Sequence, residues 1–140
     1  MATIKQFEDL DVWKLAREIA QNICLITKQE NFTHEYKLKE QVKSSSGSVM
    51  DNIAEGFGRG GRAEFIQFLS ISKGSIEELK SQLYRILDYK LIAQNEFDDL
   101  YLKADNLSAK IYSFMDYLNK SQQKGLKFKD RVLPLLKSNN

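Results

Sequence analysis

The stretch SSSGSVMDNIAEGFGRGGRAEF, from Ser44 to Phe65, decides the fold of this 140-residue chain. Its segment Gly56–Gly61 matches the pattern G-x-G-x-x-G, which binds dinucleotides when a strand precedes it and a helix follows. The residues before it have helical spacing, and they are not a strand. We therefore interpret the glycines as the end of one helix, with glycine supplying left-handed dihedral angles, and expect a new helix to open near Arg62.

Apolar residues recur at intervals of three and four on both sides of this turn, which predicts four amphipathic helices. Their expected ranges are about 10–28, 35–57, 62–90 and 96–119. Asp9 or Asp11 is the expected cap of the first helix, and Asn95 that of the last. No period-two alternation precedes the tail, so strands are not expected. The predicted fold is all-α, an antiparallel up-down-up-down four-helix bundle.

The turn also predicts which residues of the second and third helices face each other. If it centres on residues 59–61, antiparallel partners have numbers that sum to about 121. Gly47 then lies opposite Gly74, and Val49 lies opposite Ser72. Because glycine inside a helix costs about 1 kcal/mol relative to alanine, two facing glycines predict a close approach of the two backbones.

Composition places the chain among ordinary globular proteins, with 42% hydrophobic and 29% charged residues. No apolar run approaches the roughly 20 residues of a membrane span, and no secretion signal is visible at the start. Cys24 is the single cysteine, so an internal disulfide is excluded. We expect a cytoplasmic protein without membrane contact, because unpaired cysteines suit a reducing compartment.

The residues needed for enzymatic chemistry are missing from the sequence. His34 is the single histidine, and without paired cysteines or a Glu-x-x-His motif we expect no metal and no cofactor. The serines at 44, 45, 46 and 48 have no histidine or lysine base at a motif spacing, so packing explains them better than catalysis. Cys24 is expected to be a small residue in or near the core. We therefore expect a protein that is not an enzyme.

Asn52 and Glu55 are polar residues whose positions are not typical of ordinary solvent-exposed side chains. Glu55 falls at the end of the second helix, close to the start of the third. Helix N-termini have free N–H groups and attract anions. We expect the Glu55 carboxylate to accept hydrogen bonds there and hold the turn as a structural clasp.

Basic residues gather in sequence around the second helix and the turn, and they are the candidate nucleic-acid contacts: Lys37, Lys39, Lys43, Arg59, Arg62 and Lys73. Lysine and arginine bind phosphates in a salt-dependent way. Four acids, namely Glu35, Glu40, Asp51 and Glu55, are interleaved with them and make this helix nearly neutral. Residues 120–140 form a second basic region, with six basic residues against Asp130 alone. We expect a flexible tail that either contacts a partner or is merely solvated.

Two quoted segments carry a family resemblance. FEDLDVWKLARE and SVMDNIAEGFGRGGRAEFIQFLSISKGSIEELKSQL resemble the four-helix bundle family of bacterial proteins encoded in intervening sequences of large-subunit ribosomal RNA genes. They also resemble the accessory variability protein of diversity-generating retroelements. The resemblance covers about residues 7–118, and Asn52–Arg59 is its most specific part. Many members have a proline shortly before this asparagine, where Met50 and Asp51 stand here.

The resemblance implies a small helical bundle that assembles into a ring-like homopentamer. In the retroelement branch, it implies that basic surface binds nucleic acid and a reverse transcriptase. From the turn, the register and the resemblance together, the expected structural motif consists of Gly47, Asn52, Glu55, Gly56, Gly58 and Gly74. Two functions stay open: a protein that binds structured RNA or a ribonucleoprotein, and an oligomeric scaffold that contacts another protein without binding nucleic acid.

Overall fold

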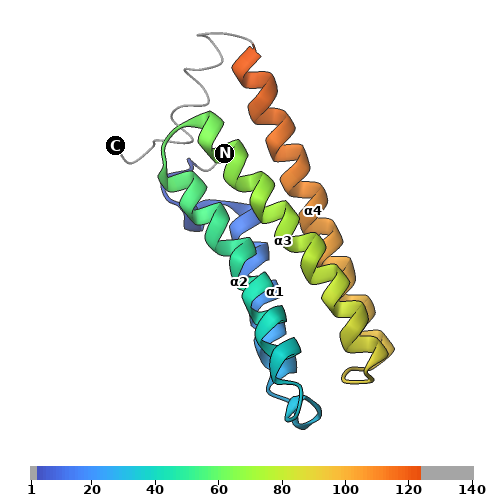
Figure 1. The fold of residues 1–140 in the computed structure, drawn as a ribbon. Coiled ribbons are helices and arrows are strands. Elements are labelled where there is room, and N and C mark those ends of the chain that lie inside the picture. Colours follow the sequence, from blue (N-terminus) through green and yellow to red (C-terminus); the bar gives the residue numbers. More distant parts are fainter. Residues whose placement is uncertain (1–2, 124–140) are drawn as a thin grey trace.

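A computed structural model describes residues 3–123 of the protein as four long helices (Figure 1). In chain order the elements are η1 (Phe7–Asp9), α1 (Asp11–Thr27), η2 (Glu30–Phe32), α2 (Tyr36–Gly58), α3 (Arg62–Asp88) and α4 (Gln94–Gln123), where η marks a 3-10 turn. The described part of the chain holds no strand. The all-α prediction with four helices is confirmed.

The long helices begin differently from the sequence-based expectation. Leu10 precedes α1, and the Asp9 carboxylate instead accepts the backbone N–H groups of Lys5 at 2.9 Å and Gln6 at 3.1 Å. Asp9 therefore stabilises the turn before the helix. α4 starts at Gln94, so Asn95 lies inside the helix. The Glu96 carboxylate accepts the N–H of Ala93 at 3.0 Å, where a capping bond from Asn95 was expected. The expected caps Asp9, Asp11 and Asn95 were wrong.

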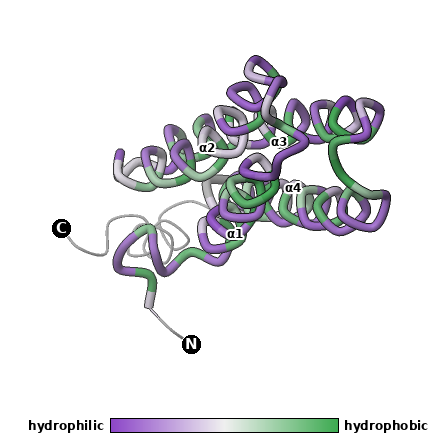
Figure 2. The backbone as a smooth tube through the Cα atoms, turned by 90° about the horizontal axis from the view of Figure 1, so that it is seen from below, coloured by the Kyte–Doolittle hydropathy of each residue, from purple (hydrophilic) through white to green (hydrophobic). Residues whose placement is uncertain are grey.

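The core lies along the line where the four helices meet. α1 packs on α2 and α4, and α3 packs on the same two helices. In Figure 2, hydrophobic and hydrophilic positions alternate along each helix, as one buried face requires. The largest fully buried side chains come from all four helices and the η2 turn, and they include Phe32, Phe65, Ile23, Ile53, Leu69, Leu83, Leu107 and Ile111.

The pairing of α2 with α3 agrees with the predicted register at Val49 and Ser72. It differs from the predicted packing at Gly47 and Gly74. The Ser72 hydroxyl donates to the Val49 carbonyl at 2.7 Å, which confirms that these residues face each other. A Cβ added to Gly47 or Gly74 would meet no atom within 4 Å, so the close approach predicted there was wrong. Gly47 lies two residues from Val49, about 200° around the helix, and therefore points away from α3.

The close approach occurs instead near the turn. A Cβ added to Gly56 would lie 2.6 Å from the Cβ of Phe68 and 3.0 Å from the Phe65 ring. Gly60 has φ 80, the left-handed conformation expected of a turn glycine, and α3 opens at Arg62 as predicted. A Cβ on Gly58 would meet nothing within 4 Å.

The last helix is longer than expected, since α4 continues to Gln123 beyond the predicted end at residue 119. The first residues of the predicted tail are therefore helical, and the rest of that tail, from residue 124, lies outside the described residues. None of the described helices is long and apolar enough to cross a membrane.

Candidate functional site

A polar seam joins α2 to α3, and Asn52 is part of it. The Asn52 side chain donates to the Ser48 carbonyl at 2.8 Å and to the Ser48 hydroxyl at 3.0 Å. That hydroxyl lies 2.9 Å from the hydroxyl of Ser75 on α3. Each small side chain thus finds a hydrogen-bond partner within the interface, which polar groups inside proteins require.

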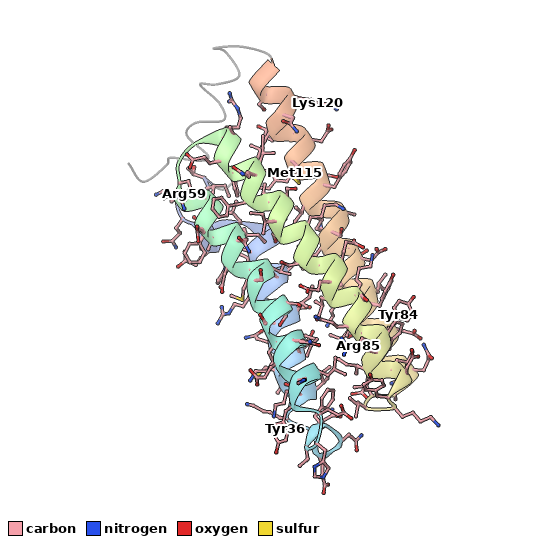
Figure 3. The ribbon with its side chains drawn as sticks, viewed as in Figure 1. Tyr36, Arg59, Tyr84, Arg85, Met115 and Lys120 are labelled. Carbon is pink, nitrogen blue, oxygen red and sulfur yellow. The ribbon has the colours of Figure 1, made fainter. Side chains whose placement is uncertain are left out.

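The seam opens into a groove toward the far end of α2 and α3. Its volume is about 440 Å³, and Ser45, Gln41, Glu78, Gln82 and Arg85 are among its lining residues. Ser45 donates to the Glu78 carboxylate at 3.2 Å, and Arg85 donates to the Gln41 side chain at 3.1 Å. Figure 3 labels Arg85 on α3. Within residues 3–123, no histidine, cysteine or lysine side chain hydrogen-bonds a serine of α2 or α3 at this interface, and Ser46 donates only to the backbone carbonyl of Lys43. The seam therefore supplies packing and hydrogen bonds, without an activated nucleophile.

Glu55 does not hold the turn in the expected way. Its carboxylate pairs with Arg59 at 3.0 Å, four residues later and directly after the end of α2, and both side chains are about half exposed. The Arg59 guanidinium also lies 5.2 Å from the centre of the Phe68 ring (Figure 3). Gly61 precedes α3 without any side-chain cap. The predicted clasp was wrong in its partner, because the i,i+4 spacing brings Arg59 within reach of the carboxylate.

Arg62 is more enclosed than a surface cation. Its Nε and Nη1 atoms are buried and have no hydrogen-bond partner among the described residues. Sequence reasoning named Arg62 as a candidate phosphate contact because basic residues gather in sequence around the second helix and the turn. The structure gives it an intermediate exposure.

The six candidate basic residues do not form one patch. Lys37 and Arg59 lie near opposite ends of α2, 22 residues apart in sequence and therefore about 33 Å apart along the axis. Lys73 lines a groove between α3 and α4 together with Glu77 and Asp105. Their grouping in sequence therefore does not become a grouping in space.

Three other lysines are neutralised by carboxylates. Lys80 pairs with Asp105 and Glu77, Lys103 with Glu18 and Asp99, and Lys120 with Asp116, all between 2.9 and 3.5 Å. The hydrogen bond to Asp105 is the main cause of a raised pKa for Lys80. These lysines stay charged near neutrality, with anions already beside them.

An aromatic group beside Lys80 was missed by the sequence reasoning. Phe97 and Tyr101 of α4 stack with ring centres 5.4 Å apart, and Tyr84 of α3 lies 4.9 Å from Phe97. Lys80 sits 5.1 Å from the centre of the Tyr101 ring. The signal was present as two i,i+4 pairs, Lys80 with Tyr84 and Phe97 with Tyr101, whose helix faces the bundle brings together.

His34 and Cys24, the single histidine and the single cysteine, lie in different parts of the fold. His34 is exposed in the turn before α2, and Cys24 is half-buried on α1. Among residues 3–123, no group of three or more His, Cys, Asp or Glu side chains is placed to hold a metal ion.

Comparison with known proteins gives the family. A model of the 23S rRNA-intervening sequence protein family matches residues 8–113. The chain belongs to this family. A crystal structure of a protein of unknown function from the S23 ribosomal protein family of Bacteroides thetaiotaomicron superposes with a TM-score of 0.67 at 21% identity, covering 74% of this chain and 97% of that one. At this identity the likeness concerns the fold alone. No curated protein matches the sequence.

Proposed function

We propose that this 23S rRNA-intervening sequence family protein is a non-enzymatic, cytoplasmic accessory factor that binds structured RNA or a ribonucleoprotein, such as one containing a reverse transcriptase. The observation that carries the proposal is that the lysines of α2 have no carboxylate partners. Lys37, Lys39 and Lys43 form no ion pair with any residue in the described part of the chain. Their charges are available to phosphates, which bind cations through counterion release.

The geometry narrows the six candidates to these three. Arg59 is engaged by Glu55 and Phe68, and Lys73 shares its groove with acids. Two guanidinium nitrogens of Arg62 are buried. Lys39 and Lys43 are four residues apart and lie on one face of α2. The proposed contact surface is therefore the first two turns of α2, hereafter the α2 lysine surface (Lys37, Lys39 and Lys43).

Assembly would multiply this surface. We propose an antiparallel up-down-up-down bundle that forms a homopentameric ring, as the family resemblance implies. In support of the antiparallel order, bonded partners run in opposite sequence directions along α2 and α3, from Val49 with Ser72 to Ser45 with Glu78. Cyclic symmetry repeats each surface around one axis, so a modest charge per protomer becomes a ring of charge.

The test is RNA affinity measured by fluorescence anisotropy over a salt series. Replacing the three lysines with glutamine removes three phosphate contacts per protomer. For each protomer that contacts the RNA, the slope of log affinity against log salt concentration should become less negative by about 2. The matched control replaces three exposed lysines outside α2, namely Lys5, Lys14 and Lys28, and should leave the slope unchanged. Equal slopes for wild type and the α2 variant would refute the proposed surface.

The second candidate function is a protein scaffold that binds no nucleic acid. Exposed apolar side chains favour it, since Leu25 is 64% exposed, Leu102 60% and Tyr112 63%. Single exposed apolar residues are common, so this observation carries less weight than the unpaired lysines. Absence of RNA binding at low salt, together with an unchanged oligomer, would favour the scaffold.

A further inference from the structure

An apolar groove lies at the end of the bundle where α4 finishes. Its volume is about 320 Å³, and its apolar lining comes from Ile4, Leu10, Val12, Phe65, Phe114 and Leu118. These residues belong to the N-terminal segment and the first turns of α1 and α3, together with the last part of α4. We call it the end groove. Ile4 and Phe114 are the partly exposed members of this lining, and the other four side chains form its buried floor. Exposed apolar patches often mark interaction sites.

Two carboxylates stand beside the apolar lining. Asp9 and Asp11 contribute to the end groove together with one cation, Lys110, which leaves its charged lining with a net negative charge. Neither carboxylate forms an ion pair with a residue between 3 and 123. Backbone N–H groups, with that of Lys5 first, lower the pKa of Asp9. It is therefore ionised at neutral pH. The occupant that fits is apolar with positive charges at its edge.

We propose that residues 126–136 of the same chain dock in this end groove. This segment, LKFKDRVLPLL, supplies apolar side chains in Leu126, Phe128, Val132, Leu133, Leu135 and Leu136. Its first half also carries three cations, Lys127, Lys129 and Arg131, against the single acid Asp130. The composition matches the groove in both respects. Apolar side chains would cover its lining, while the cations meet Asp9 and Asp11.

The connection is short enough for docking within one chain. α4 ends at Gln123. Leu118 lies five residues and Phe114 nine residues before that end, so the groove begins about 8 Å back along the helix and extends to about 14 Å. A chain that reverses direction covers about 3.3 Å per residue, so about three residues reach the near side of the groove and four or five reach its far side.

Arg62, at the same end of the bundle as the end groove, has buried donors that need hydrogen-bond acceptors. It precedes Phe65 by three residues and therefore lies on the same face of α3, one turn nearer the end of the bundle. Its buried Nε and Nη1 have no acceptor within residues 3–123. Leaving such donors unsatisfied is costly, and the backbone carbonyls of a docked segment would be suitable acceptors.

Paramagnetic broadening in the full-length protein tests this proposal without RNA, and so independently of the proposed function. A nitroxide is attached to Ser138→Cys in a Cys24→Ser background, and methyl signals are recorded before and after reduction of the label. We expect Ile4, Leu10 and Leu118 to lose more than half of their intensity. Leu91 and Ile92, near the other end of α3, serve as internal controls and should keep theirs.

A mixed sample separates docking within one chain from docking between copies. Spin-labelled chains without isotope are co-refolded with isotope-labelled chains without nitroxide. Broadening in the directly labelled protein alone supports the proposal, and its loss on replacing Leu126, Phe128 and Leu133 with serine strengthens it. Absence of broadening, or equal broadening in the mixed sample, would overturn docking within the chain.

Discussion

Replacing Gly56 with alanine tests the packing of the α2–α3 corner. In a helix, alanine is ordinarily favoured over glycine by about 1 kcal/mol. Here the new Cβ would lie 2.6 Å from the Cβ of Phe68. That atom is fixed to its own backbone, so no change of rotamer relieves the contact and the two helices must separate.

The expected magnitude follows from these two opposing effects. Overpacking costs about 1–3 kcal/mol, and a contact against a backbone-fixed atom belongs near the upper end. Subtracting the gain in helix propensity leaves a net loss of about 2 kcal/mol in the free energy of unfolding. For a domain of this size, that is a drop of about 6–8 °C in Tm.

Gly47 and Gly74 provide matched controls for the same substitution. Neither has an atom within 4 Å of an added Cβ, so alanine should raise the free energy of unfolding by up to about 1 kcal/mol at each position. The assay is urea denaturation followed by circular dichroism at one fixed protein concentration, since assembly shifts apparent stability. If Gly56→Ala were as stabilising as Gly47→Ala, the close approach at Gly56 would be refuted.

Three further predictions concern single side chains. Ser72→Ala removes a buried hydroxyl that donates to the Val49 carbonyl, and we expect a loss of about 1 kcal/mol in chemical denaturation. Arg59→Ala breaks an exposed pair with Glu55 and a contact with Phe68, so the loss should stay below about 1 kcal/mol and shrink in high salt. Asp9→Asn should destabilise the protein at neutral pH. Because the folded pKa is lowered, the difference should persist above the ordinary value of 3.8 and vanish as the pH falls through the folded value, as measured by Tm against pH.

Each of these predictions has an outcome that contradicts it. Ser70 is exposed on the same helix, and a Ser70→Ala effect as large as that of Ser72→Ala would argue against the interhelical hydrogen bond. A loss well above 1 kcal/mol for Arg59→Ala would mean that this side chain is part of a larger buried network. A pH-independent effect of Asp9→Asn would exclude the ionised carboxylate as its cause.

Helical periodicity was sufficient to predict the four helices and the turn at Gly60, because both depend on local spacing and backbone conformation. The pairing of Val49 with Ser72 followed from the turn by arithmetic. The position of the close approach did not, since it depends on which side each glycine faces. Gly47 and Gly74 are partners by the predicted register, but a Cβ on either would contact no atom of the other helix. Gly56, by contrast, faces Phe68.

The candidate site was less predictable, because charges close in sequence separate along a rigid helix. Lys37 and Arg59 appear grouped in the sequence and lie at opposite ends of α2. Glu55 was expected to accept hydrogen bonds from the start of α3, but its carboxylate pairs with Arg59, which lies nearer in the sequence. The Tyr84–Phe97 contact required the α3–α4 packing, which no single-helix pattern contains.

The most direct test of the central claim, that this protein binds RNA through the α2 lysine surface as part of a ring, is multi-angle light scattering with and without structured RNA over a salt series. We predict the mass of five protomers for the protein alone, an added RNA mass at low salt and its loss as salt rises. Absence of any RNA-bound mass at low salt would contradict the account.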